Sequence, residues 1–344
     1  MKFKKCIALL LSTVMIFGLL AGCSGGADGG KLEGKRVRVV IGSTSTGGDS
    51  YMMADIVTRY LSEEMGFNGK VDPVGNAAAL DAISTAKGDG TTIMMFHDMT
   101  FLSVLFGAVG EEYSLENLTV GPRFGQNPGA CFAASADAPY DDLKGIAEYL
   151  KANPGETVSV NIESGAASHL AFVAFWLWVD EAYGSDVSGR IKAIVGGTTD
   201  EKKQRLWDGN ADVIYGDYSS FVEFTKDGVD AQLAMKMFGS CGKIEGVTSM
   251  EDEGVTFQGK PYSFNKDFAM YFPKDMDEEV LKEIAEAMAK VCENPEFQKE
   301  MQALQYTPLS AADVALEASQ KFIADKRELS KALVEAAPSL DSLT

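Results

Sequence analysis

The chain has 344 residues, of which 46% are hydrophobic and 24% are charged, a balance typical of one large or two medium globular domains. Its 50 acidic residues outnumber 31 lysines and arginines, which gives a formal charge of -19. Nucleic acid is excluded as a partner, because a dense line of phosphates requires basic residues. An anionic ligand would have to be held by local groups, since the overall field repels it.

The N-terminus predicts export and a lipid anchor. Three lysines precede an uncharged stretch from Cys6 to Gly22, which is short for a membrane span but suits the apolar region of a secretion signal. The stretch ends in Leu-Ala-Gly-Cys, which resembles the lipobox of bacterial lipoproteins. We therefore expect a signal peptide over 1–22, a lipidated Cys23 that holds the protein at the cell membrane, and a flexible tether over 23–34.

After the tether, short β-branched runs alternate with segments of helical periodicity. The first series predicts strands at 36–42, 71–74 and 91–96 and helices at 50–65 and 78–86. The second series predicts strands at 158–162, 191–195 and 211–215 and helices at 140–152, 168–183 and 200–207. Two apolar segments between the series, 118–124 and 130–135, are candidates for crossing strands. The tail over 277–336 is predicted to be helical, with breaks at two prolines.

Strands separated by crossover helices predict an α/β protein with mainly parallel sheets that are covered on both faces. Two strand-to-helix loops share one design: Gly42 to Asp49, and Glu163 to Ser168. Small hydroxyl and glycine residues before a helix expose its unpaired N–H groups, and the helix dipole adds positive potential. Such a loop can hold a carboxylate or phosphate, although Asp49 and Ser168 could equally be simple N-caps.

Catalysis and metal binding are poorly supported. The two histidines, His97 and His169, make a Ser/His/Asp site arithmetically possible, with Ser164 or Ser168 as nucleophile and Asp98 as the orienting acid. No Gly-x-Ser-x-Gly motif surrounds either serine, however, and no cluster of His, Asp and Glu has metal-ligand spacing. We therefore expect no enzyme, no metal and no cofactor. After Cys6 and Cys23, three cysteines remain, an odd number whose simplest interpretation is buried free thiols.

Several segments from about residue 35 to 326 resemble a known family, the substrate-binding lipoproteins of tripartite tricarboxylate transporters, also called the Bug family. The most specific match is the Ser-Gly…Ser-His-Leu segment, here Ser164 to Leu170. The loop that ends in Gly-Gly-Asp at Asp49, the Gly-Asp-Gly-Thr-Thr turn at 88–92 and the stretch LWDGNADV at 206–213 are similar to further family motifs.

The resemblance implies a two-lobed periplasmic-binding-protein fold of the Venus-flytrap, type II-like kind, with crossing strands as the hinge. Such a protein binds a small carboxylate between its lobes without catalysis and presents it to a membrane permease. Lobe one is expected over 35–123 and 241–344 and lobe two over 124–240, in a monomer. The resemblance also places Cys131 and Cys241 near the hinge, where they could form a disulfide.

The resemblance maps ligand contacts onto loops of both lobes. In lobe one they are Ser45, Thr46, Gly47, Asp49, Gly75, Asn76 and Ala77. In lobe two they are Ser164, Gly165, Ala166, Ser168, Gly197, Thr198 and Asp217. We add neighbouring polar residues and both histidines to these contacts: Ser43, Thr44, His97, Asp98, His169 and Tyr218.

The chain departs from the family where Asp98 and Asp217 follow predicted strands, since small residues are usual there. If these acids line the cleft, they would repel a tricarboxylate and could pair with an amine or hydroxyl. We therefore expect a smaller or amino-bearing carboxylate rather than citrate. Two other functions remain open: a ligand-sensing module for a receptor kinase, and a surface-anchored hydrolase.

Overall fold

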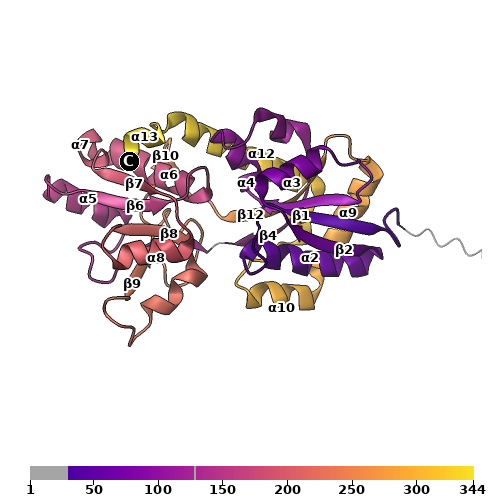
Figure 1. Cartoon of the computed structure of the whole chain (residues 1–344), viewed down its shortest axis with the longest axis horizontal. Coiled ribbons are helices and arrows are strands. Elements are labelled where there is room, and N and C mark those ends of the chain that lie inside the picture. The colour runs from indigo at the N-terminus through magenta and orange to yellow at the C-terminus, as the bar shows by residue number, and fades with distance from the viewer. Residues whose placement is uncertain (1–29, 128) are drawn as a thin grey trace, which may run out of the picture.

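The computed structural model describes residues 30–127 and 129–344 (Figure 1). The predicted signal peptide, Cys23 and most of the predicted tether lie outside the described residues. Residues 31–34 do not belong to a tether, because Leu32 is fully buried and the Lys31 main-chain N–H donates to Glu283 Oε2 at 2.9 Å. Within the described ranges, no helix is both long enough and apolar enough to cross a membrane.

The first lobe is a five-stranded sheet flanked by helices. Its elements before the crossing are β1 (Arg36–Ile41), α2 (Asp49–Met65), β2 (Asn68–Pro73), α3 (Asn76–Ser84), β3 (Thr92–His97), α4 (Met99–Leu105) and β4 (Leu118–Asn127). Its elements after the return are β12 (Lys266–Pro273), α9 (Glu278–Glu293), α10 (Pro295–Ala303), α11 (Ala311–Val314) and α12 (Leu316–Ala336).

The second lobe repeats this design. Its elements are β5 (Ala130–Ser135), α5 (Leu143–Ala152), β6 (Val158–Ile162), α6 (Ala167–Tyr183), α7 (Ser185–Ser188), β7 (Ile191–Val195), α8 (Thr199–Trp207), β8 (Val213–Asp217), β9 (Met235–Phe238) and the hairpin of β10 (Thr256–Phe257) and β11 (Lys260–Pro261). The predicted α/β fold with two lobes is confirmed, and the bounds of β6 and β7 agree with the sequence periodicity.

Each sheet is mixed, so the prediction of mainly parallel sheets was wrong. The strand order is β2-β1-β3-β12-β4 in lobe one and β7-β6-β8-β5-β9 in lobe two. The strands joined by crossover helices pair in parallel, as predicted, but β12 is antiparallel to both of its neighbours and so is β5. The antiparallel half of each sheet exists because the crossing strands enter it from the other lobe.

The chain passes between the lobes at two β-strand connections, from β4 to β5 and again into β12. Residues 239–264 remain with lobe two, since Cys241 N donates to Ala130 O and Leu143 N donates to Glu253 Oε2. The return therefore occurs next to Lys266 rather than at residue 241, and the predicted boundary there is corrected. This connection places Lys266 at the junction of the lobes.

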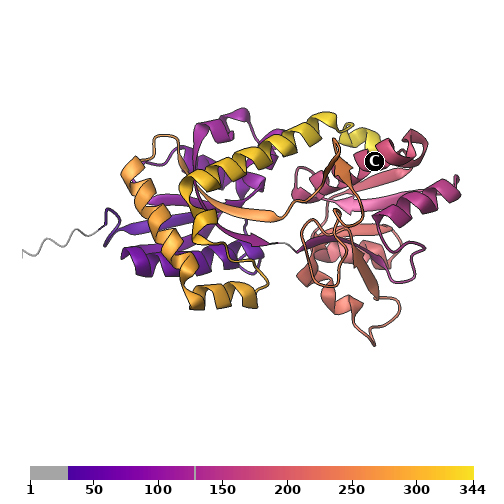
Figure 2. The same ribbon diagram turned by 180° about the vertical axis from the view of Figure 1, so that it is seen from behind.

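The C-terminal helices also join the lobes (Figures 1 and 2). Helix α12 packs on β4 and α4 of lobe one and, farther along, on α6 of lobe two. A final short helix, α13 (Leu340–Leu343), contacts β7, and Leu343 is buried there. The C-terminus thus ends on the second lobe, although most of the tail belongs to the first.

Candidate functional site

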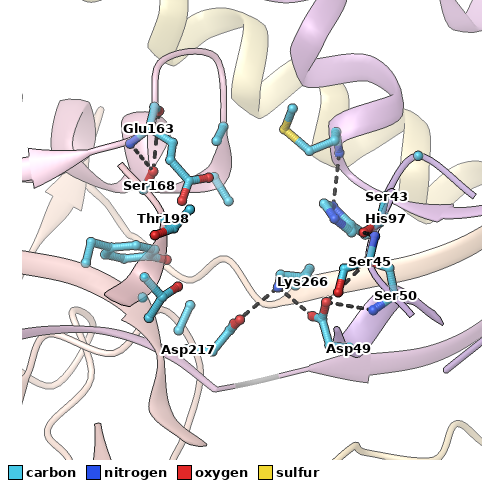
Figure 3. Close-up of a pocket in the computed structure, with 18 of the residues that line it drawn as sticks. Ser43, Ser45, Asp49, Ser50, His97, Glu163, Ser168, Thr198, Asp217 and Lys266 are labelled. Atoms are coloured by element: carbon cyan, nitrogen blue, oxygen red, sulfur yellow. Dashed lines mark hydrogen bonds and ion pairs between the residues drawn. The ribbon is translucent and has the colours of Figure 1, made fainter. Parts of the chain in front are cut away.

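A cavity of about 870 Å³ lies between the two lobes, at the ends of β1 and β3 on one side and of β6 and β8 on the other. We call it the cleft (Figure 3). Eleven of the sequence-predicted site residues line it: Ser43, Thr44, Ser45, Asp49, Asn76, His97, Ala166, Ser168, Gly197, Thr198 and Asp217. The structure thus brings together loops that are up to about 170 residues apart in the chain.

The other predicted residues lie elsewhere. Gly47 and Tyr218 line a neighbouring cavity of about 750 Å³, which shares Asp49 and Asp217 with the cleft. Seven line neither cavity: Thr46, Gly75, Ala77, Asp98, Ser164, Gly165 and His169.

Asp98 belongs to the core of lobe one, which corrects its predicted place at the ligand. It is fully buried, with Oδ1 2.7 Å from Lys326 Nζ of α12. Its Oδ2 accepts a hydrogen bond from the Asp267 main-chain N–H at 3.0 Å. Burial raises the pKa of Asp98 to about 6, against the opposing effect of Lys326. Asp98 therefore links β3, β12 and α12 and is unable to repel a tricarboxylate in the cleft.

His169 closes one side of the interface between the lobes instead of facing the cleft. Its ring stacks on Phe106 of lobe one, with centroids 4.3 Å apart and planes at 19°. Its Nδ1 accepts from the Gly165 main-chain N–H at 3.3 Å. Burial lowers the pKa of His169 to about 4, so the imidazole is neutral at pH 7.

His97 is likewise neutral, because burial, and then the nearby Lys266 ammonium, lower its pKa to about 3. Its Nδ1 accepts from the Met99 main-chain N–H at 3.3 Å. In the described part of the chain, neither imidazole is hydrogen-bonded to a serine hydroxyl, so the Ser/His/Asp arrangement that the hydrolase hypothesis requires is not assembled.

Two of the helices that begin at the cleft, α3 and α6, have neither a capping side chain nor an acidic residue at their start. Gly75 is the N-cap of α3 and Ala166 that of α6, and neither helix has a side-chain cap or an acidic residue in its first turn. Ser168 is not a cap: it lies inside α6, where its Oγ accepts from Glu163 N at 2.9 Å. One uncapped helix start therefore faces the cleft from each lobe, with the positive potential that favours an anion.

The other helix starts at the cleft are already occupied. At α4, whose first residue Met99 lines the cleft, the N-cap is Asp98 and the Met99 main-chain N–H donates to His97 Nδ1.

The starts of α2 and α8 carry their own carboxylates. Asp49 occupies the first turn of α2, and the loop before it is internally bonded, because Ser43 Oγ accepts from Ser45 N at 3.1 Å. In α8, Thr198 and Glu201 form a capping box, in which Glu201 Oε2 accepts from Thr198 N at 2.6 Å. An external carboxylate is therefore less favoured at α2 and α8 than at α3 and α6.

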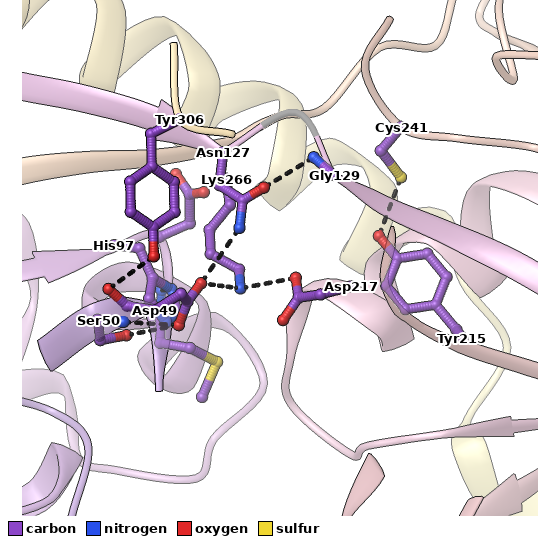
Figure 4. Close-up of polar contacts among 12 residues, drawn as sticks. Asp49, Ser50, His97, Asn127, Gly129, Tyr215, Asp217, Cys241, Lys266 and Tyr306 are labelled. Carbon is purple, nitrogen blue, oxygen red and sulfur yellow. Dashed lines mark hydrogen bonds and ion pairs between the residues drawn. The ribbon is translucent and has the colours of Figure 1, made fainter. Parts of the chain in front are cut away.

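Lys266, which the sequence did not single out, bridges the lobes at the floor of the cleft (Figure 4). Its Nζ lies 2.6 Å from Asp49 Oδ2 of lobe one and 3.1 Å from Asp217 Oδ1 of lobe two. Burial alone would raise the pKa of Asp49, but Lys266 holds it well below its usual value. The pKa of Asp217 is raised by burial and by the adjacent Asp49, with Lys266 opposing. One ammonium thus serves two carboxylates.

Acidic side chains outnumber basic ones in the lining of the cleft. Four carboxylates line it, those of Asp49, Glu163, Glu201 and Asp217, against the two lysines Lys202 and Lys266. The second lysine is also paired, since Lys202 Nζ lies 2.7 Å from Glu163 Oε1. In this part of the structure, both cleft ammonium groups are thus already compensated by acids of the chain itself.

The three remaining cysteines are buried free thiols, so the disulfide between Cys131 and Cys241 that the resemblance left open is not formed. Cys241 Sγ lies 3.1 Å from the Tyr215 hydroxyl instead. Burial raises the pKa of Cys241 to about 12, so the group stays a thiol at neutral pH.

Comparison with solved structures shows which fold this is. MatC from Rhodopseudomonas palustris, solved with bound malate, superposes with a TM-score of 0.66 at 14% identity, over 87% of this chain and 99% of that chain. The periplasmic binding protein BugD superposes with a TM-score of 0.62 at 18% identity, over 88% of this chain and 97% of that chain. Another R. palustris protein, solved with adipate, superposes with a TM-score of 0.61 at 15% identity, over 89% of this chain and 99% of that chain. The chain has the fold of a periplasmic solute-binding protein.

No protein-family model matches the sequence, and no curated protein matches it either. The periplasmic-binding-protein fold accounts for the position of the cleft, because ligands of open α/β sheets bind beyond the carboxyl ends of the strands. Here the ends of β1 and β3 face those of β6 and β8, and Lys266 lies where the returning strand enters lobe one.

Proposed function

We propose that this protein is an extracytoplasmic solute receptor that captures a small organic acid in the cleft and delivers it to a permease of the tripartite tricarboxylate transporter type. The observation that carries the proposal is the pair of uncapped helix starts, α3 and α6, which face one cleft from opposite lobes. Each offers main-chain N–H groups to an anion, and neither needs a positive net charge of the protein.

A dicarboxylate suits this arrangement best. One carboxylate would lie at the start of α3, near Asn76, and the other at the start of α6, near Ala166 and Ser168. Closure of the lobes would then bury both charges among preorganised donors. The solved relatives with malate and adipate, both dicarboxylates, support this choice.

Hydrogen-bond acceptors in the cleft favour a ligand that also carries a donor. Asn76 Oδ1 is buried and has no hydrogen-bond partner among the described residues. Asp217 shares its lysine with Asp49, so a hydroxyl or amino group on the ligand could donate to either acceptor. Asp98, by contrast, no longer contributes to the expected preference for an amino-bearing acid.

The anchor and the transport partner complete the proposal. Lipidation of Cys23 would hold the receptor at the outer face of the cell membrane, within reach of permease subunits. The receptor would act as a monomer without metal or cofactor.

Isothermal titration of residues 24–344, which include both lobes, with malate, adipate, citrate, aspartate and glutamate tests the proposal. Ala166→Asp is the informative variant, because it places a carboxylate at the N-cap of α6. An Asp N-cap stabilises a helix by about 1 kcal/mol relative to Ala. The variant should therefore unfold at higher urea concentration yet lose carboxylate binding.

Ala315→Asp is the matched control, since Ala315 is the exposed, uncapped N-cap of α12 and does not line the cleft. It adds the same charge to the chain and should leave binding unchanged. Failure of all five acids to bind the unaltered chain would refute the proposed function. Binding that survives Ala166→Asp would refute the assignment of α6 as a carboxylate site.

A further inference from the structure

Lys202 is a buried, positively charged residue of lobe two at the cleft. Its side chain is 2% exposed, although it belongs to the first turns of α8 and lines the cleft. Its ammonium donates to Glu163 Oε1 at 2.7 Å and to the main-chain oxygen of Tyr215 at 3.1 Å. A lysine this deeply buried needs a negative partner, because an unpaired charge in such a place is strongly unfavourable.

The negative partner is itself weakly held. The Glu163 side chain is 50% exposed, and Lys202 is the one hydrogen-bond and ion-pair partner of its carboxylate in the described structure. It lies between the end of β6 and the start of α6 and points into the cleft (Figure 3). Glu163 can therefore rotate into solvent at little expense, provided that another anion replaces it on Lys202.

Two of the other cleft carboxylates are held more firmly. Asp49 accepts from Lys266, from Asn127 Nδ2 at 3.3 Å and from Ser50 N at 2.7 Å. Glu201 belongs to the capping box of α8. Exchange with an incoming carboxylate is thus easier at Glu163 than at Asp49 or Glu201. Asp217 also accepts from one residue only in the described structure, Lys266 at 3.1 Å, but it shares that lysine with Asp49.

We propose that Glu163 occupies a carboxylate subsite on Lys202 in the unliganded protein and that a carboxylate of the ligand displaces it. The inference rests on the proposed function and assigns to lobe two a cationic subsite beside the start of α6. Exchange of one carboxylate for another leaves the buried ammonium paired throughout. The released Glu163 regains full hydration, so the uncompensated charge lies in solvent rather than in the buried part of the cleft.

The subsite also explains how an acidic cleft can take an anion. Glu163 and Lys202 together contribute no net charge while they are paired. Once the ligand has replaced Glu163, the same lysine neutralises the ligand, and the surplus negative charge lies at the exposed rim. The three groups together then carry one negative charge, which lies on the exposed, hydrated carboxylate of Glu163 rather than on a buried group.

The test is titration with malate, or with the member of the panel above that binds the unaltered chain tightest. Glu163→Gln removes the competing carboxylate and should tighten binding about two- to fivefold, the strength of a partly exposed ion pair. Lys202→Met, which preserves side-chain length, should weaken binding by about tenfold or more. Circular dichroism and a thermal melt verify that each variant folds.

The double variant separates displacement from simple repulsion between Glu163 and the ligand. If Glu163 competes for Lys202, the gain from Glu163→Gln disappears when Lys202 is already methionine. If Glu163 only repels an anion, the gain persists in that background, and the inference is overturned.

Glu223→Gln and Lys226→Met are the matched controls, because this pair in lobe two has the same 2.7 Å separation, is exposed and does not line the cleft. They change the net charge identically and should leave affinity unchanged. Weaker binding by Glu163→Gln would show that Glu163 accepts from the ligand, which also overturns displacement. If no acid binds the unaltered chain, the proposed function fails; if one binds and the Glu163 and Lys202 variants do not alter it, this inference fails alone.

Discussion

Replacement of Lys266 by methionine should destabilise the protein far more than loss of an ordinary ion pair. The Lys266 ammonium is 2.6 Å from Asp49 and 3.1 Å from Asp217, and its side chain is 14% exposed. Lys266→Met keeps the length of the side chain but leaves two adjacent carboxylates without their cation. Removing one partner of a buried ion pair costs about 3–5 kcal/mol, which is the decrease expected in the free energy of unfolding at pH 7.

The loss of stability caused by Lys266→Met should depend on pH. In the unaltered protein, Lys266 lowers the pKa of Asp49, so this pairing stabilises the fold above the unfolded pKa near 4 and is lost at lower pH. In Lys266→Met the two carboxylates raise each other's pKa, and protonation of one relieves their repulsion. The deficit of the variant should therefore shrink as the pH falls from 7 to 4.

Equilibrium urea unfolding at several pH values measures both effects. Lys290→Met is the control, since Lys290 and Glu64 are 2.7 Å apart but their side chains are 68% and 35% exposed. Loss of that surface pair should cost about 0–1 kcal/mol. A Lys266→Met deficit no larger than the control's, or one that grows on acidification, would refute the reasoning about the bridge.

Two further predictions concern the histidines and the anchor. Because burial lowers the pKa of His97 to about 3 and of His169 to about 4, the unfolded chain binds more protons than the native chain below pH 6.5. The free energy of unfolding should fall between pH 7 and pH 5 by up to about 1.4 kcal/mol per pH unit for each histidine. Replacing both histidines with asparagine should make this decrease with pH smaller. An unchanged pH dependence in the double variant would contradict the argument from burial. Cys23→Ser should move the protein from the membrane fraction to the soluble fraction of a cell extract, as an immunoblot would show, and retention at the membrane would exclude the lipid anchor.

Local sequence determined most of the secondary structure and both loops of the cleft. Helix α6 was predicted within one residue because its apolar residues follow helical spacing and Gly184 ends it. The two loops before α2 and α6 were recognised from small residues between a strand and a helix, and both reach the cleft. Such signals are readable because they depend on neighbours along the chain.

The charged contacts of the site were decided by tertiary structure alone. Lys266 pairs with Asp49, 217 residues away, because the returning strand β12 inserts between β3 and β4. The apolar run from Phe268 to Phe272 could have predicted that strand, but not that the lysine before it faces two acids. The same topology places Asp98, directly after β3, in the core against Lys326, while Asp217, the last residue of β8, lines the cleft.

The sequence by itself thus determined which segments form the walls of the cleft, since helix starts and loops are local features. The tertiary structure decided which of their charges are already paired, because ion pairs depend on chain segments that only the fold brings together. Glu163 is an example. In the sequence it is part of the loop motif that includes Ser164, whereas in the structure it pairs with Lys202, a buried residue of α8.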